Sequence, residues 1–224
     1  MISTEQVRIY RALREAGKYF HGRLLQGVPR DILVATAQEF GLWKGGVLVA
    51  EQDETDILTE RLIYDRRWDG KTTLEHFADR NAGTCLTSEE QRLFAAMQNG
   101  IFSLFRIQAI HPGSHAVLSD RLAELRMGQA QPLVELIDMG LSETGVPGAL
   151  LATRLLDAGG FVMTAGVSYP FSIEREPAIL SYLRQKEFGY RKRRLDLPEN
   201  YSLYFFRLHR RFGVEVMYRS EGED

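Results

Sequence analysis

The segment from Pro132 to Phe171 constrains the fold most strongly, because turn residues divide its apolar residues into three short runs. The runs Leu133–Ile137, Ala149–Leu156 and Phe161–Val167 predict strands. Between the last two, Asp157–Gly160 has the Gly-Gly composition of a hairpin loop. Both of these runs are apolar on each face, which predicts that both faces are covered. No nucleophile, metal or phosphate motif lies in the segment.

A further hairpin is predicted upstream, where Ile107 and Ala109 alternate with polar residues before a His-Pro-Gly-Ser turn and a return strand over 117–122. The residues before it are predicted to be helical. Ser3, Thr72 and Thr87 are each followed three residues later by Gln or Glu, the spacing of a capping box. Helical periodicity predicts helices over 3–26, 30–40 and 54–64.

The resulting fold class is α+β: a helical N-terminal half packed on a small antiparallel, barrel-like sheet and closed by C-terminal helices. We divide the chain into a helical region (1–100), an antiparallel β unit (101–171) and a basic, aromatic helical region (172–224), which together can form one compact domain. The C-terminal helices are expected over 178–188 and 199–212, although the aromatic residues of the second also suit a strand.

Composition excludes several classes of protein. The 224-residue chain has one cysteine, Cys85, so it cannot form an internal disulfide, and we expect it in the reducing cytoplasm. It has neither the apolar core of a signal peptide nor an unbroken apolar run that would span a bilayer, so no membrane partner is expected. The sequence does not indicate an oligomeric state and leaves a homo-oligomer open.

Two apparent catalytic motifs fail on spacing. Asp69–Thr73 resembles the end of a phosphate-binding loop, but Asp65 stands where that loop needs a glycine. Ser142 resembles a nucleophile elbow, but Thr144 replaces its second glycine. We therefore assign no catalytic residue and no cofactor.

His111 and His115 flank the predicted Pro-Gly-Ser turn, so both imidazoles can face one point. With Asp120 or Asp138 they would form a metal site. Nothing in the spacing requires this arrangement, and a pair of histidines on a turn is more often solvated. We predict that the chain binds no structural zinc and keep a hydrolase or metal-dependent enzyme at this hairpin as the alternative function.

The C-terminal region supplies the main functional signal. Residues 184–219 carry ten bases and four acids, whereas residues 1–183 have a net charge of −5. Aromatic residues alternate with the bases, a combination that suits single-stranded nucleic acid because bases stack and phosphates pair with cations. The same aromatics suit a core, and the bases can instead pair with the acidic remainder of the chain. The expected binding residues are Arg191, Lys192, Arg193, Arg194, Arg207, Arg210 and Arg211.

The segments TLEHFADR, SLFRIQ, LIDMGLSETGVPGALLATRL and FVMTAGVSYPF resemble an uncharacterised bacterial family. The resemblance covers roughly residues 60–171. It implies a helix-rich N-terminal region followed by a compact β unit, and in some members a metal-binding SEC-C knuckle. The clustered cysteines of that knuckle are absent here. The resemblance implies no catalytic residue.

The sequence thus favours a non-enzymatic binding module that contacts nucleic acid or an acidic protein surface through its C-terminal region. An enzyme at His111 and His115 would need a deep polar pocket. A structural subunit of a larger assembly would need a large exposed apolar patch.

Overall fold

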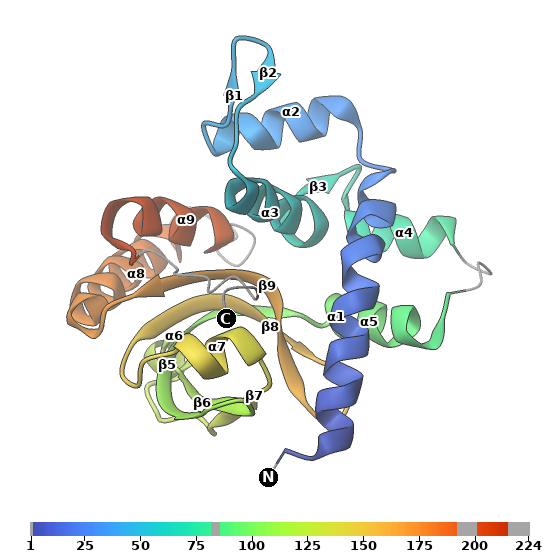
Figure 1. The fold of residues 1–224 in the computed structure, drawn as a ribbon. Coiled ribbons are helices and arrows are strands. Elements are labelled where there is room, and N and C mark those ends of the chain that lie inside the picture. The colour runs from blue at the N-terminus through green and yellow to red at the C-terminus, as the bar shows by residue number, and fades with distance from the viewer. Residues whose placement is uncertain (1, 82–85, 192–200, 215–224) are drawn as a thin grey trace, which may run out of the picture.

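The computed structural model describes residues 2–81, 86–191 and 201–214, and for 186–191 the backbone only. Helices pack beside a small barrel, and the predicted α+β class is confirmed (Figure 1). The first helices are α1 (Thr4–Leu25), α2 (Arg30–Glu39), α3 (Gln52–Glu60), α4 (Thr73–Arg80) and α5 (Ser88–Gln98). A single π-helical turn, η1 (Arg61–Asp65), continues α3.

The three predicted capping boxes are confirmed. The hydroxyls of Ser3, Thr72 and Thr87 each accept a hydrogen bond from a backbone N–H three residues later, and the Gln or Glu at that position bonds back to the cap. Each box satisfies two backbone N–H groups that the first helical turn leaves without partners. These local signals place the starts of α1, α4 and α5.

The barrel closes in the order β5-β6-β7-β9-β8. Its strands are β5 (Ile101–His111), β6 (His115–Asp120), β7 (Val134–Leu136), β8 (Leu150–Asp157) and β9 (Val162–Phe171). The predicted hairpin between β8 and β9 is confirmed. The sheet was expected to be antiparallel, but the barrel is mixed, because β7 pairs with β9 in parallel where Leu136 meets Val162. Its other neighbouring pairs are antiparallel, as expected.

Several short elements complete the fold. Two hairpins of two-residue strands join the first helices: β1 (Trp43–Lys44) with β2 (Val47–Leu48), and β3 (Arg67–Trp68) with β4 (Lys71–Thr72). Helix α6 (Arg121–Met127) follows β6, and α7 (Met139–Thr144) occupies the segment expected to be a loop. Asp138 caps α7 by accepting a hydrogen bond from the Leu141 N–H. These helices are too short to show an apolar period, so their caps were the only signal.

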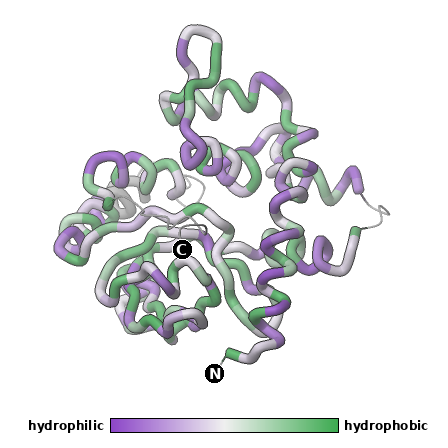
Figure 2. The backbone as a smooth tube through the Cα atoms, viewed as in Figure 1, coloured by the Kyte–Doolittle hydropathy of each residue, from purple (hydrophilic) through white to green (hydrophobic). Residues whose placement is uncertain are grey.

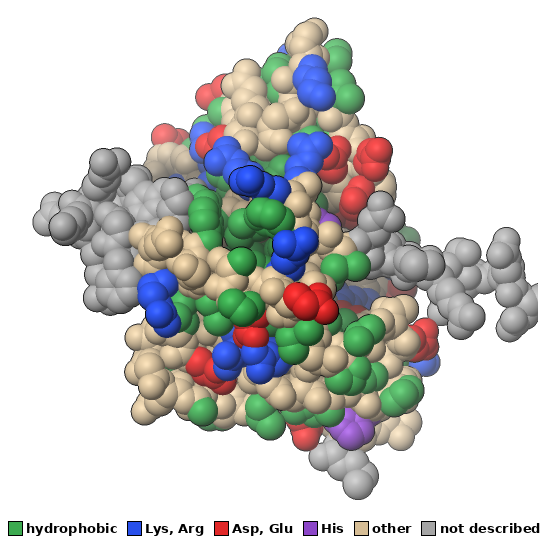
Figure 3. All heavy atoms as spheres, turned by 90° about the vertical axis from the view of Figure 1, so that its left-hand side faces the viewer, with side chains coloured by type: hydrophobic (Ala, Val, Ile, Leu, Met, Phe, Trp, Pro, Cys, Tyr) green, Lys and Arg blue, Asp and Glu red, His purple; other side chains and the backbone are tan. Residues whose placement is uncertain are grey.

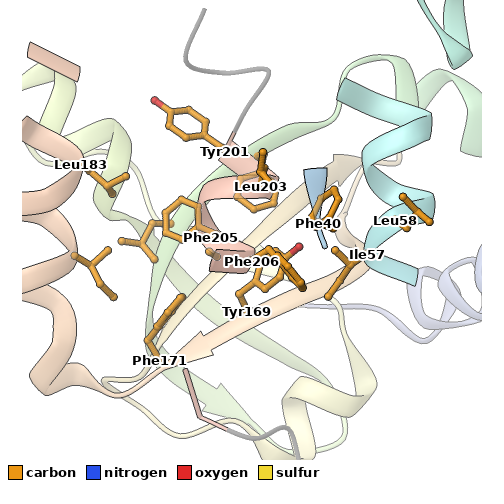
Figure 4. Close-up of a cluster of buried hydrophobic side chains, with 14 of the residues drawn as sticks. Phe40, Ile57, Leu58, Tyr169, Phe171, Leu183, Tyr201, Leu203, Phe205 and Phe206 are labelled. Carbon is orange, nitrogen blue, oxygen red and sulfur yellow. The ribbon is translucent and has the colours of Figure 1, made fainter. Parts of the chain in front are cut away.

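The C-terminal elements are η2 (Ile173–Arg175), α8 (Glu176–Arg191) and α9 (Tyr201–Phe212), and they cover one side of the barrel (Figure 1). The apolar residues lie mainly along the strands and the inward sides of the helices (Figure 2). Helix α9 contributes Tyr201, Phe205 and Phe206 to a cluster with β9 and α3 (Figure 4). A second cluster joins α1, α4 and α5 to the barrel. No helix in the described ranges is both long and apolar enough to cross a bilayer.

Candidate functional site

The predicted basic surface is only partly described. Arg207 donates a hydrogen bond of 3.2 Å to the Glu39 carbonyl oxygen, and Arg210 lies 3.4 Å from the Glu54 carboxylate. The Arg211 guanidinium lies 5.0 Å from the centre of the Phe212 ring. The side chain of Arg191, and all of Lys192, Arg193 and Arg194, lie outside the described residues. Two of the three described cations therefore contact the N-terminal half of the same chain.

Most aromatic side chains of α9 are core residues. Tyr201, Phe205 and Phe206 are buried, so their faces are not open to a nucleic-acid base. Tyr204 is half-buried, and Phe212 has 36% of its surface exposed. The guanidinium groups of Arg175 and Arg211 lie 5.5 and 5.0 Å from the centre of the Phe212 ring. Lys and Arg side chains are scattered among hydrophobic ones on the face where α8 and α9 lie (Figure 3).

The histidine pair lies on the β5–β6 hairpin, where the rings of His111 and His115 stack with their centres 4.2 Å apart. Burial, and then the neighbouring His111, lower the pKa of His115. The expected carboxylates are engaged elsewhere: Asp120 bonds to Ser103, and Asp138 bonds to Thr164. Within the described ranges, no three His, Cys, Asp or Glu residues gather where they could hold a metal. Ser142 donates to the Met139 carbonyl from within α7.

A pocket that the sequence did not predict lies between α1, the α3–η1 segment and β9. Its volume is about 310 Å³, at the lower end of the roughly 300–1,000 Å³ range of small-molecule sites. The polar and charged side chains that line it are Arg14, Lys18, His21, Asp56, Thr59, Glu60, Tyr64 and Thr164. Apolar side chains such as Leu13, Ile63 and Met163 complete the wall.

Two backbone irregularities shape this pocket. The register of the β8–β9 pair jumps from Thr153↔Ser168 to Leu155↔Thr164, so one residue of β8 opposes three of β9. Those three residues, 165–167, line the pocket, and Gly166 has a φ of +131°. The second irregularity is η1, which carries Ile63 and Tyr64 into the wall. Bulges and π-helical turns are both over-represented at functional sites.

The β8 residue opposite the bulge is Arg154, which is buried in the centre of an ionic cluster. Its Nη2 lies 2.6 Å from Oδ1 of Asp65, and its Nε lies 3.4 Å from Oε1 of Glu60. Ser202 of α9 donates a hydrogen bond of 2.6 Å to the other oxygen of Asp65. The guanidinium also lies 4.4 Å from the centre of the Tyr64 ring. Carboxylates on both sides thus satisfy a charge that would otherwise be costly to bury.

Glu60 connects this cluster to the pocket. The residue is 5% exposed, and burial raises its pKa to about 7, with a further increase from Asp65 and a partial decrease from Arg154. Its Oε2 and the buried hydroxyl of Tyr64 have no hydrogen-bond partner among the described residues. Burial also raises the pKa of Tyr64, so its hydroxyl stays neutral. Both residues line the pocket, and each has one buried polar atom without a side-chain hydrogen-bond partner among the described residues.

The α1 side of the pocket carries the opposite charge. Arg14 donates from Nη2 to Thr164 at 2.5 Å and lies 3.1 Å from Asp138, and its Nε bonds to Tyr10. Burial, and then the charge of Arg14, lower the pKa of His21. Lys18, also in the lining, is exposed and pairs with Glu15 at 2.6 Å.

One sequence signal pointed toward this site: Arg154 interrupts the apolar run LLATRLLD, although every residue from Leu150 to Leu156 is buried. A charged residue in a buried strand needs a partner, and Glu60 and Asp65 at the end of a predicted helix were available. Gly166 within the predicted strand 161–167 was an available signal of the bulge in β9, because an isolated glycine inside a strand often marks one.

No curated protein and no solved structure matches the chain. A family model described as a family of unknown function, DUF7986, matches residues 4–219. That match agrees with the resemblance to an uncharacterised family. Since it covers almost the whole sequence, the chain belongs to the family of unknown function DUF7986.

Proposed function

We propose that this protein binds a small polar molecule in the pocket between α1, the α3–η1 segment and β9. The observation that carries the proposal is the pair of buried atoms at its wall, Glu60 Oε2 and the Tyr64 hydroxyl, which have no partner among the described residues. A buried polar atom without a partner costs about 1–3 kcal/mol. A ligand that bonds to either atom would recover part of that cost, so these residues favour a polar occupant.

Two further features support a binding site. The pocket combines apolar walls with a few polar groups from different elements, the usual composition of a small-molecule site. A carboxyl group with a strongly raised pKa in a cleft is also typical of functional sites, although structural ion pairs shift pKa values as well.

A thermal-shift screen of a fragment library tests the proposal. We expect a subset of polar fragments to raise the melting temperature of the wild-type protein. Thr59→Phe places a ring at the pocket wall and should abolish these shifts. Thr55→Phe, one turn earlier on α3 and outside the pocket lining, is the matched control and should keep them. Equal shifts in all three proteins, or none in any, would contradict the proposal.

An anionic partner, nucleic acid or an acidic protein surface, is the second candidate, contacted from the C-terminal region by Arg207, Arg210, Arg211 and the Arg191–Arg194 segment. The exposed ring of Phe212 between Arg175 and Arg211 favours it. Binding to single-stranded DNA should weaken with salt by a slope of about −0.7 per phosphate contact. Replacing Arg175 and Arg211 with Gln should reduce both affinity and slope. No binding at low salt in a filter assay would remove the nucleic-acid form of this candidate.

The setting and assembly of the protein are also proposals. The single cysteine and the resemblance to bacterial proteins support a bacterial cytoplasm. The β1–β2 hairpin supports a homo-oligomer or a larger assembly, because Val47, Leu48 and Val49 are 58, 40 and 51% exposed. If this hairpin forms the contact, Val47→Lys should lower the mass measured by light scattering. A monomeric wild-type protein would remove the homo-oligomer.

A further inference from the structure

Charged side chains of opposite sign reach the pocket from different elements. Helix α1 contributes Arg14 and Lys18, whereas α3 contributes Asp56 and Glu60. Apolar side chains lie in the same wall, among them Leu13 and Met163. A ligand complementary to this pocket therefore carries two opposite charges on a short apolar body, since complementary potentials determine specificity.

The acidic side chains of the lining can accept a cation. Glu60 Oε2 is buried and has no partner in the described part of the chain, and the Tyr64 hydroxyl is in the same condition. Arg154 pairs with two carboxylates at once, Asp65 at 2.6 Å and Glu60 at 3.4 Å, so its single positive charge faces two negative groups. An ammonium group has three donors and no acceptor. It can donate to a carboxylate and to a phenol oxygen, the two kinds of acceptor that Glu60 and Tyr64 bring to the pocket lining.

The basic side chains of the lining can accept a carboxylate. Arg14 uses Nε and Nη2 for its bonds to Tyr10, Asp138 and Thr164. Within the described ranges Nη1 has no bond, and 27% of the side chain is exposed. Lys18 has only the exposed pair with Glu15, and such a pair contributes about 1 kcal/mol at most. Lys18 can therefore turn toward a ligand at little cost.

From these contacts we propose that the pocket takes a small zwitterion, with its ammonium at Glu60 and Tyr64 and its carboxylate at Arg14 and Lys18. This inference rests on the proposed function of the pocket. The volume of about 310 Å³ limits the ligand to the size of a single amino acid or a similarly small metabolite.

Three matched probes separate the two charges: norleucine, hexanoate, which lacks the amine, and pentylamine, which lacks the carboxylate. By isothermal titration calorimetry at pH 7, we expect norleucine to bind at least tenfold more tightly than either of the others. Glu60→Gln should weaken the binding of norleucine at least tenfold. Glu143→Gln, the same substitution on an exposed residue of α7, should leave the affinity unchanged.

Proton release gives a second readout. Around Glu60 the structure places Arg154 on β8, Asp65 and Tyr64 on η1, and the Val167 backbone on β9, and burial keeps the carboxyl partly protonated near pH 7. A bound ammonium should ionise it, so the measured enthalpy should change with the ionisation enthalpy of the buffer in the wild type and not in Glu60→Gln.

The outcomes separate the two proposals. If hexanoate or pentylamine binds as tightly as norleucine, the zwitterion is wrong. A second outcome is that norleucine fails to bind while fragments still raise the melting temperature of the wild type and not of Thr59→Phe. In that case the zwitterion is the wrong ligand class, and the proposed function of the pocket stands. If no compound gives a shift that depends on Thr59, both are overturned.

Discussion

The hydroxyl of Ser202 donates a hydrogen bond of 2.6 Å to Oδ2 of Asp65, which lies 137 positions earlier in the chain. Through this bond the first turn of α9 contacts the carboxylate that neutralises Arg154. The same cluster includes Glu60, which lines the pocket. The ionic cluster therefore links the C-terminal helix, the barrel and the candidate ligand site.

Ser202→Ala should lower the free energy of unfolding by about 1–2 kcal/mol, because it leaves a buried carboxylate oxygen with one fewer donor. Ser181→Ala, on the exposed side of α8, should change it by less than about 0.5 kcal/mol. Urea denaturation of both variants measures the difference. Equal effects would show that the Ser202 bond does not contribute to stability.

Arg154→Met should lower the free energy of unfolding by about 3–5 kcal/mol, because it removes the cation that faces Asp65 and Glu60 in a buried cluster. The control is Arg8→Met, which breaks the exposed pair with Glu5 and should have an effect below about 1 kcal/mol. Chemical denaturation at pH 7 checks both. If Arg154→Met lowers the free energy of unfolding no more than Arg8→Met does, the assignment of Arg154 to the cluster is contradicted.

The stability of the protein should depend on the protonation of Glu60. In the folded state its pKa is raised from 4.5 to about 7, so between these values the folded protein binds the proton more strongly than the unfolded chain does. The contribution of Glu60 is fully present below pH 4.5 and is lost as the pH rises through 7.

Glu60→Gln removes this dependence. As the pH rises from 4.5 to 8, the free energy of unfolding of the variant should increase relative to that of the wild type, by roughly 3 kcal/mol at most. Denaturation curves of the two proteins across this range measure the difference. If the difference in unfolding free energy between the two proteins stays constant across this pH range, Glu60 does not titrate within it.

Gly166 and Gly22 offer a matched test of the bulge in β9. A Cβ built at either position meets no atom within 4 Å, but only Gly166 has a positive φ, of +131°. Gly166→Ala should therefore destabilise the protein by about 1–3 kcal/mol through backbone strain. Gly22→Ala, inside α1, should stabilise it by up to about 1 kcal/mol. A thermal melt showing the same sign for both would contradict the strained geometry.

The parts of the fold that sequence predicted correctly depend on local signals. Ser3, Thr72 and Thr87 marked helix starts because a capping box is contained within four residues. The β8–β9 hairpin followed from the Gly-Gly pair between two apolar runs. The short helix α7 was missed because six residues show no apolar period, and its cap at Asp138 lay at the end of a strand.

The pocket depends on contacts that no local pattern contains. Arg154 meets Glu60 and Asp65 across 94 and 89 positions of the chain. The bulge at Gly166 exists only in relation to the register of β8. The aromatic residues of α9 illustrate the same limit, since their composition suited either a core or a stacking surface. Their burial followed only from the position of α9 against Phe40, Tyr169 and Phe171.

The most direct test of the pocket as the binding site is crystallography of the full chain soaked with a library of small polar fragments. We expect bound fragments between α1, the α3–η1 segment and β9, with a polar atom within hydrogen-bond distance of Glu60 Oε2 or the Tyr64 hydroxyl. Fragments that gather on other surfaces, while only water occupies the space beside Glu60 and Tyr64, would contradict the account.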